Sequence, residues 1–423
     1  MTILAKKKTA NKKPEQAPLP LFDTLKQMST NLLARNNSLQ LKNLSFESQK
    51  DYEQIFQFLL SYRGSEATFN AYRRELERFF QWCYLIVKLN FSQIQRDHIE
   101  TFINFCQNPP HHWISLHNQP RFIDREGLRQ PNPAWRPFVV NVSKKDYSQA
   151  LPKKVSDYAL SQSAIQAIFS ILSSFFQYLV QNEYCKHNPV RLIRQKSKFL
   201  RKQHSQKMVR RLSELQWSYV IETAELLAKQ NPLQHERTLF IMNALFALYL
   251  RISELAASNR WIPKMADFFC DIDGNWWFLT VGKGNKERQV SVSDAMLNAL
   301  KHYRQSLGLS PFPNPKEATV LIQKNNGKGP ITSTRQIRKI VQFCFDEAII
   351  RLKNDGFLED ADRLMSATVH WLRHTGISED VKIRPREHVR DDAGHSSGAI
   401  TDRYIDVELR ERHASAKNKK IIP

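Results

Sequence analysis

One stretch of charge divides the chain and constrains what can fold on either side of it. From Arg191 to Arg211 the sequence carries nine Lys or Arg residues and no acidic residue. Apolar residues recur at three- and four-residue spacing before and after this stretch, which predicts two largely helical domains. Charge of one sign between two such domains favours a connector that lies along a phosphate backbone, and a disordered linker is the alternative.

The positive charge extends over the whole chain. Its 423 residues include 63 Lys or Arg and 41 Asp or Glu, which gives a formal net charge of +22. Nucleic acid is the first partner that this charge indicates, because Lys and Arg that neutralise phosphates release counterions. A ribosome-associated or merely basic soluble protein is the alternative.

The five cysteines are widely spaced and odd in number, and none forms a Cys-x-x-Cys pair. This pattern indicates no zinc site, so we expect reduced, mostly buried thiols in a cytosolic protein, with no metal and no cofactor. The N-terminus lacks the apolar core of a signal peptide. We also expect no stretch that is long and apolar enough to span a membrane.

We divide the sequence into a tail (1–44), a helical domain (45–190), the basic linker (191–211) and a second domain (212–423). The tail begins MTILAKKKTANKKPEQAPLP, with five lysines and three prolines. Such a composition is typical of a disordered basic segment.

The helical domain shows amphipathic periodicity. In SEATFNAYRRELERFFQWC an apolar face runs from Phe69 to Cys83 and leaves Arg73, Arg74 and Arg78 largely off that face. A further strong helix is predicted over SAIQAIFSILSSFFQYLVQN, which carries a continuous apolar stripe.

A third helix and an irregular segment lie between these two. Asp97, with Glu100 three residues later, predicts a capping box at the start of the third helix. Residues 108–156 hold seven prolines together with Trp113 and Trp135, which indicates a long ordered loop or small insertion. We expect its aromatic residues to pack onto the helices, and anchoring a partner is the alternative.

The second domain is predicted to be helical with a small antiparallel sheet. Ser213 and Gln216 form a capping-box pattern where it opens. Short strands follow at 276–281 and 289–292, separated by a glycine-rich turn, and helices resume at Asp294. The fold class is therefore mainly α, in two domains.

Five segments of the second domain carry reactive side chains. Taken singly, each has an ordinary explanation, such as a salt-bridge arginine, a lysine in a turn, a polar surface pair, a helix start or a core tyrosine. Together they provide what cutting DNA without a metal ion requires: forked cations for phosphate oxygens, proton donors and acceptors, and a nucleophile. The segments are LRISEL (250–255), GKGNKER (282–288), HWLRHT (370–375), GHSS (394–397) and ITDRY (400–404).

The order Arg, Lys, His-x-x-Arg, His, Tyr in these segments resembles the signature of the tyrosine recombinase (phage integrase) family. The local context is similar too, since GKGNKER is nearly identical to the hairpin that carries the catalytic lysine in Xer-like members. The resemblance covers about 50–410 and implies a DNA clamp built from a core-binding domain and a catalytic domain.

The resemblance implies a role for each matching residue. Arg251 and Arg373 would clamp the scissile phosphate, and His395 would donate a hydrogen bond to it. Glu254 resembles a family acid that supports the site from behind.

The remaining matches concern the nucleophile and the protons. Tyr404 would attack the phosphorus and form a 3′-phosphotyrosyl bond. His370 would assist proton transfer from Tyr404, and Lys283 would be the general acid for the departing 5′ oxygen.

The resemblance also implies partners. These are double-stranded DNA, a homo-tetramer that exchanges strands through a Holliday junction on paired sites, and accessory DNA-bending or directionality proteins. The protein would be bacterial, cytoplasmic and associated with the nucleoid, with no membrane partner. The expected DNA-binding residues are Arg73, Arg74, Arg191, Arg194, Lys196, Lys198, Arg201 and Lys202.

Some features depart from the family pattern. Tyr249 stands where glycine is common, and Ala393 stands where leucine is usual. The insertion at 108–156 and the polar stretch KNDGFLEDADR favour a mobile-element integrase over a chromosome-dimer-resolving Xer protein. The segment after Tyr404 is expected to contact a neighbouring protomer, and docking on its own protomer is the alternative.

Two other functions fit part of the pattern. A type IB topoisomerase shares the chemistry, but the KGNKER hairpin and the GHSS segment favour the recombinase. A DNA-binding regulator that has lost catalysis is the third hypothesis, and the intact set of reactive residues counts against it.

Overall fold

The computed structural model divides into two compact units, residues 1–205 and 206–423. The residues that the structure describes are 17–30, 45–141, 152–191, 193, 210–282, 284–324, 327, 329–395, 397–401 and 416–417. Each unit has its own hydrophobic core, and each is described by itself.

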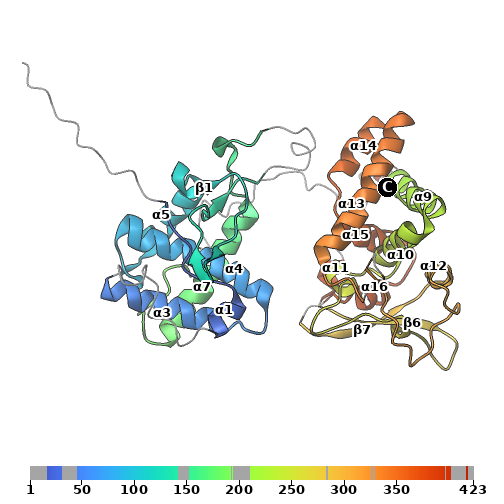
Figure 1. Ribbon diagram of the computed structural model, residues 1–423, viewed down its shortest axis with the longest axis horizontal. Helices are drawn as coiled ribbons and strands as arrows, with labels where there is room; N and C mark the ends of the chain where they lie inside the picture. The colour runs from blue at the N-terminus through green and yellow to red at the C-terminus, as the bar shows by residue number, and fades with distance from the viewer. Residues whose placement is uncertain are drawn as a thin grey trace, which may run out of the picture. The chain divides into compact units, whose positions relative to one another are not determined.

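The first unit is a helical bundle around an aromatic core (Figure 1). Phe79 lies at its centre and packs against the rings of Phe91, Phe102 and Phe176 at centroid distances of 5.0 to 5.8 Å. Its helices are α1 (Leu25–Thr30), α3 (Phe46–Leu60), α4 (Glu66–Trp82), η2 (Cys83–Val87), η3 (Phe91–Gln93), α5 (Arg96–Gln107), η4 (His111–Trp113), η5 (Val155–Asp157) and α7 (Gln162–Gln181).

Helix α7 confirms the predicted strong helix and qualifies one expectation. It is the one helix among the described residues that is long and apolar enough to cross a membrane by length and composition, whereas the sequence led us to expect none. Eight of its side chains, from Ile165 to Leu179, are buried in the core of the first unit. This burial identifies α7 as a core helix.

The prediction of a disordered tail over 1–44 was wrong for residues 17–30. Phe22 is buried and its ring stacks on Tyr52 at 4.8 Å. Glu77 accepts hydrogen bonds from the backbone N–H groups of Leu21 and Phe22, and Gln81 donates to the carbonyl of Leu19. Buried apolar and polar contacts therefore fix this segment on α4. The rest of the predicted tail, 1–16 and 31–44, lies outside the described residues.

Helix α4 confirms the predicted apolar face but not the exposure of its arginines. Arg73 is only 9% exposed and donates to the carbonyl of Asp23 and the side chain of Asn70. Arg78 is also largely enclosed, because it pairs with Glu75 and donates to the carbonyl of Pro137. Arg74 is exposed, as predicted.

The capping box predicted at Asp97 and Glu100 is two positions out of place. Helix α5 begins at Arg96, and Nδ1 of His98 accepts a hydrogen bond from the backbone N–H of Gln95. Asp97 instead lies in the first turn, where its negative charge favours the helix N-terminus.

The insertion is ordered where the structure describes it. Trp113 and Phe138 are buried against the helices, and Trp135 is buried beside the Arg121 guanidinium. The expectation that the aromatic residues pack inward is thus confirmed. Its short strands are β1 (Ile114–Ser115), which pairs in parallel with β4 (Phe138–Val139), and the antiparallel hairpin of β2 (Phe122–Arg125) and β3 (Leu128–Pro131).

The second unit packs helices against a three-stranded antiparallel sheet (Figure 1). Strands β6 (Trp276–Val281) and β7 (Glu287–Ser291) confirm the predicted pair, whereas β5 (Phe268–Cys270) was not predicted. Its helices are α9 (Glu214–Gln230), α10 (Pro232–Ala247), α11 (Ile252–Leu255), η7 (Met265–Asp267), α12 (Asp294–Ser306), α13 (Thr334–Asn354), α14 (Leu358–Met365), α15 (Val369–Asp380), α16 (Arg386–Ala393) and α17 (Gly398–Thr401).

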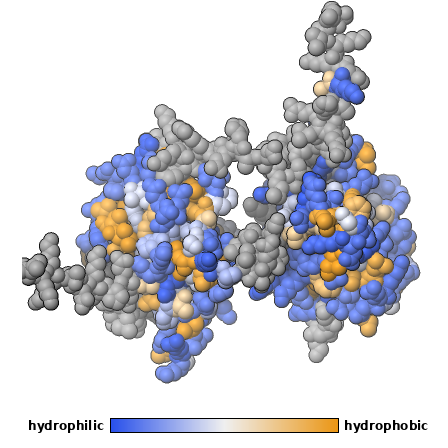
Figure 2. All heavy atoms as spheres, turned by 90° about the horizontal axis from the view of Figure 1, so that it is seen from above, coloured by the Kyte–Doolittle hydropathy of each residue, from blue (hydrophilic) through white to orange (hydrophobic). Residues whose placement is uncertain are grey.

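The capping box at Ser213 and Gln216 is confirmed at the start of α9. The fold class, mainly α with a small antiparallel sheet, is likewise confirmed. Four of the five cysteines are buried and Cys270 is exposed. Hydrophilic residues cover most of the described surface that Figure 2 shows, with smaller apolar areas among them.

Candidate active site

A carboxylate anchors the site. Glu254 is 1% exposed, and it accepts hydrogen bonds from the backbone N–H of Arg251 at 2.8 Å and from Nη1 of the same residue at 2.9 Å. The i, i+3 spacing places Glu254 in the single turn of α11, directly below the arginine that precedes this helix. The contact holds the Arg251 guanidinium, which stays 30% exposed, in one orientation.

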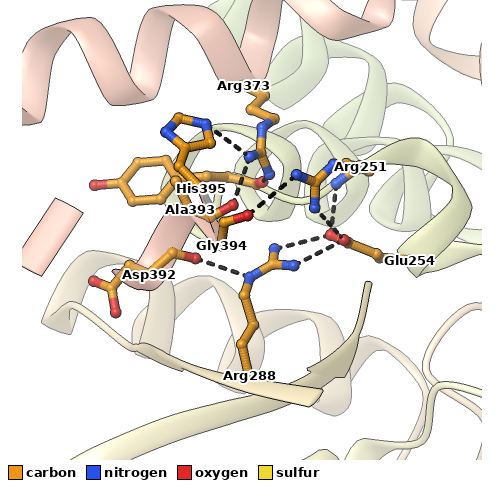
Figure 3. A network of polar contacts seen from close by, with 9 residues as sticks. Arg251, Glu254, Arg288, Arg373, Asp392, Ala393, Gly394 and His395 are labelled. Carbon is orange, nitrogen blue, oxygen red and sulfur yellow. Dashed lines mark hydrogen bonds and ion pairs between the residues drawn. The ribbon is translucent and has the colours of Figure 1, made fainter. Parts of the chain in front are cut away.

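A second arginine, on the sheet, binds the same carboxylate. Arg288 on β7 donates to both oxygens of Glu254, at 2.8 and 2.9 Å, and its Nε donates to the carbonyl of Asp392 at 2.9 Å (Figure 3). Burial alone would raise the pKa of Glu254, but the hydrogen bonds and charge of Arg288, with those of Arg251, lower this pKa below its usual range. Glu254 is therefore ionised, and its pair with Arg288, which also binds the carbonyl of Asp392, connects α11, β7 and α16.

Arg373 supplies the second predicted guanidinium. It lies on α15, is 2% exposed, and donates to the backbone carbonyls of Tyr249 and Ala393. Its Nη2 also lies 3.3 Å from Nε2 of His395. On the opposite ring edge, Nδ1 of His395 lies 2.9 Å from Oγ1 of Thr401. Figure 3 shows Arg251, Arg373 and His395 on one side of the network.

The histidines of the site are neutral near pH 7. Desolvation, with the charges of Arg373 and Arg251, lowers the pKa of His395 to about 4. Desolvation and the same two arginines also lower the pKa of His370. Its ring meets that of His374 edge to face at 4.4 Å, and desolvation and the neighbouring cationic groups lower the pKa of His374 to about 4. Neutral imidazoles can accept or donate a proton in a reaction at physiological pH.

Not every predicted residue can be placed. Lys283 and Tyr404 lie outside the described residues, as do the linker residues Arg194, Lys196, Lys198, Arg201 and Lys202. Arg191 is exposed, as a DNA contact requires, whereas the burial of Arg73 removes it from the surface.

Two described residues adjoin the positions that cannot be placed. A Cβ added to Gly282, the residue before Lys283, would lie 3.1 Å from Oε1 of Glu254. Thr401, three residues before Tyr404, is the hydroxyl partner of His395.

Sequence reasoning missed Arg288. GKGNKER was singled out for its lysine, yet the alternation along β7 places Arg288 on the same face as the buried Val290. An arginine directed inward needs a carboxylate partner, so this alternation was the signal that could have found it.

The described side chains form a site for an anion. Two guanidinium groups are held by acceptors that fix their direction, and a neutral imidazole lies against one of them. Fixed, forked cations of this kind stabilise the negative charge that develops on a phosphoryl group during transfer. Fold and site together define a two-unit, mainly helical protein whose fixed guanidinium groups have the chemistry to bind a phosphoryl group.

Comparisons with known proteins agree with this class. Tyrosine recombinase XerC of Pediococcus pentosaceus is 26% identical over 256 residues, covering 59% of this chain and 73% of the relative. XerC of Bacillus licheniformis is 26% identical over 340 residues, covering 78% of this chain and 95% of the relative. No family model matches the chain.

The fold agrees as well. The crystal structure of the XerH site-specific recombinase in its post-cleavage complex with a palindromic difH substrate superposes with a TM-score of 0.53. The sequences are 13% identical, and 93% of each chain is covered. These likenesses support an assignment to the tyrosine recombinase and integrase family and an activity as a site-specific recombinase.

Proposed function

We propose that this enzyme integrates and excises a mobile DNA element, using a tyrosine nucleophile and no metal ion. The observation that carries the proposal is the convergence of Arg251, Arg373 and His395 beside the ionised Glu254. The residue order and the local sequence around each group support the assignment of Lys283, His370 and Tyr404 to the same site.

The two arginines would bind the scissile phosphate. A guanidinium makes forked hydrogen bonds and keeps its charge, so Arg251 and Arg373 can neutralise both non-bridging oxygens as the pentacovalent state forms. His395 would donate a further hydrogen bond to the same phosphate from Nε2, which requires that Nε2 gains a proton when the phosphate takes the place of its contact with Arg373. Glu254 and Arg288 would not touch the DNA, but they hold Arg251 in place.

The reaction exchanges one phosphodiester for another. The hydroxyl oxygen of Tyr404 attacks the phosphorus, its proton passes to His370, and a 3′-phosphotyrosyl bond forms. The bond from phosphorus to the 5′ oxygen breaks, and Lys283 protonates that oxygen. A tyrosine hydroxyl has a pKa of about 10, so the adjacent cationic groups are needed to stabilise the phenolate. The energy of the phosphodiester is conserved, and a second 5′ hydroxyl can reverse the step without ATP.

Recombination would take place in a homo-tetramer on two double-stranded DNA sites, through a Holliday junction, with accessory DNA-bending or directionality proteins. The segment after Tyr404 would contact a neighbouring protomer. The folded insertion of the first unit and the stretch 353–363 support a mobile-element role, because a minimal member of the family does not need them.

The DNA backbone would lie along the basic linker. Arg191 and Arg74 are exposed and available for phosphate contacts, and the linker residues Arg194 to Lys202 would extend the same contact. Arg73 is excluded from this set because it is buried. The net charge of +22 supports a polyanionic partner of this kind.

Trapping on a nicked suicide duplex tests the chemistry. The sequence of the duplex is taken from DNA that flanks the gene. Because the duplex is nicked near the scissile phosphate, cleavage releases a short 5′-hydroxyl fragment and leaves the protein attached. We expect wild type to give an adduct that resists denaturant, and Tyr404→Phe, which keeps the ring and removes the nucleophilic oxygen, to give none.

The other outcomes separate the alternatives. An adduct in both proteins would move the nucleophile away from Tyr404. Specific binding with no adduct in either would favour a DNA-binding regulator. Adduct formation with relaxation of supercoiled DNA, but no exchange between two sites, would favour a type IB topoisomerase.

A further inference from the structure

Tyr249 has an unusual backbone conformation beside the active site. Its φ of +49° lies in the left-handed region, which disfavours residues with a Cβ. The side chain is 1% exposed, and its hydroxyl donates to Oδ2 of Asp380 and accepts from Nη1 of Arg384 at 2.9 Å. Such a conformation persists only where its surroundings hold it, and here the buried hydroxyl is held at two points.

Arg384 connects this tyrosine to the end of α16. Its Nη2 donates to Oδ2 of Asp392 at 2.6 Å and to Oγ of Ser291 at 3.0 Å. The other oxygen of Asp392 accepts from the backbone N–H of Ser291 at 3.2 Å. A single guanidinium therefore links Tyr249, Asp392 and the last residue of β7.

The residues at the two ends of this network, Tyr249 and Asp392, lie at or next to the residues that accept hydrogen bonds from Arg373. The two carbonyls that accept from Arg373 belong to Tyr249 and to Ala393, the residue after Asp392. Arg384 thus binds the side chains of Tyr249 and Asp392, which lie at or next to both carbonyls. Figure 3 shows Ala393 and Asp392 adjoining the arginine cluster.

The direction of Arg373 also sets the protonation of His395. A guanidinium can only donate, so Nε2 of His395 must be the acceptor in the 3.3 Å contact. The neutral ring then carries its hydrogen on Nδ1, facing Oγ1 of Thr401. The tautomer of His395 therefore reports whether Arg373 is in place.

We propose that Tyr249 and Arg384 are positioning residues, which act through two backbone carbonyls to aim Arg373 at the scissile phosphate. The role rests on the proposed function, since it assigns the phosphate contact to Arg373. Removing the Tyr249 hydroxyl frees the residue to leave the left-handed region, and its carbonyl then turns away from Arg373.

Nitrogen NMR of the free, full-length protein gives the first test. His395→Gln identifies the ring signals of His395. In wild type at pH 7 we expect an unprotonated Nε2 and a protonated Nδ1, and in Tyr249→Phe a shift toward the Nε2–H form. Tyr219→Phe is the matched control, because Tyr219 on α9 also donates to a carboxylate, Asp355, at 2.7 Å.

Cleavage gives the second test, with a duplex that carries either a phosphate or an uncharged methylphosphonate at the scissile position. We expect Tyr249→Phe to slow adduct formation on the phosphate by about tenfold to a hundredfold, less than the loss of a transition-state donor outright. On the methylphosphonate, which has less negative charge for Arg373 to neutralise, the loss should be below about threefold. Arg384→Lys should repeat this pattern, because an ammonium cannot span the same acceptors.

Either test can overturn the proposal. An Nε2–H tautomer in wild type, or the same tautomer in wild type and Tyr249→Phe, would show that the hydroxyl does not hold Arg373. Equal losses on the two substrates would indicate general damage to the fold. If wild type forms no adduct, the proposed function fails, whereas the NMR comparison still decides whether Tyr249 positions Arg373.

Discussion

At the scale of single residues, the active site depends on how one carboxylate is shared. Glu254 binds Arg251, which is 30% exposed, and Arg288, which is 10% exposed. The buried pair with Arg288 uses both carboxylate oxygens, so the carboxylate cannot rotate when Arg251 engages a ligand. Arg288 thereby limits how far Arg251 can move.

We expect Arg288→Lys to weaken both stability and catalysis. A lysine keeps the charge, but it cannot bind two carboxylate oxygens and the carbonyl of Asp392 together. The loss should be about 1–3 kcal/mol in the free energy of unfolding, measured by denaturant titration, with slower adduct formation. Arg363→Lys, at an exposed pair with Glu359 on α14, is the control and should change neither quantity. Wild-type behaviour of Arg288→Lys would mean that Glu254 needs only a nearby charge.

At the scale of elements, two departures from the family pattern meet in one cluster. Tyr249 and Ala393 are both buried with Ile377 of α15 and Val389 of α16. The family resemblance places glycine and leucine at these two positions. The large tyrosine and the small alanine therefore fill one shared space, as a glycine and a leucine would.

A double-mutant cycle tests this compensation. Tyr249→Gly should cost about 3 kcal/mol, because the loss of a buried ring outweighs the relief of the backbone. Ala393→Leu alone should cost about 1–3 kcal/mol by overpacking. The double variant should lose at least about 1 kcal/mol less free energy of unfolding than the two single losses added together, as measured by denaturant unfolding. Additive losses would contradict a shared space.

The predictions from sequence succeeded where local chemistry decides the structure. The stripe of α7, the box at Ser213 and strand β6 follow from short-range periodicity and capping. Arg251, Glu254 and Arg373 were assigned from the resemblance of their short motifs to the family signature, and the structure brings Arg251 and Glu254 into contact.

The failures concern contacts that are distant in sequence. Arg73 is buried by Asp23, 50 residues away, and Arg384 reaches Ser291 across 93 residues. No periodicity encodes such pairings. The burial of Phe22 on α4 likewise depends on the tertiary fold, since the composition of its segment alone indicates disorder.

At the scale of the whole molecule, two buried carboxylates, one in each unit, have pKa values shifted in opposite directions. Glu254 in the second unit is 1% exposed, and its two arginines lower its pKa. Asp51 in the first unit is 2% exposed, and the groups that donate to it are neutral, namely the Tyr184 hydroxyl at 2.8 Å and the Phe91 N–H at 2.9 Å. Burial therefore prevails and raises the pKa of Asp51 to about 7.

This difference predicts that Asp51 makes the first unit less stable as the pH rises. The folded state binds the proton more tightly than the unfolded chain, whose aspartate pKa is about 3.9. The contribution of Asp51 to the free energy of unfolding is therefore fully present below about pH 4 and decreases between about pH 4 and 7. The accumulated loss is on the order of 2 to 4 kcal/mol. Asp51→Asn cannot ionise and keeps an acceptor oxygen.

Hydrogen exchange of α3 in the intact chain, corrected for the intrinsic effect of pH, is the measurement. At pH 4.5 we expect α3 to be protected in Asp51→Asn equally to or less than in wild type. At pH 8 we expect α3 to be protected more in Asp51→Asn than in wild type. Asp362→Asn, an exposed carboxylate of α14, removes the same charge and should leave the pH profile of α3 unchanged. A variant that follows the wild-type profile from pH 4.5 to 8 would mean that Asp51 ionises in the folded unit as easily as in water. Burial would then have been outweighed by the two neutral donors, and the contrast with Glu254 would not depend on arginine.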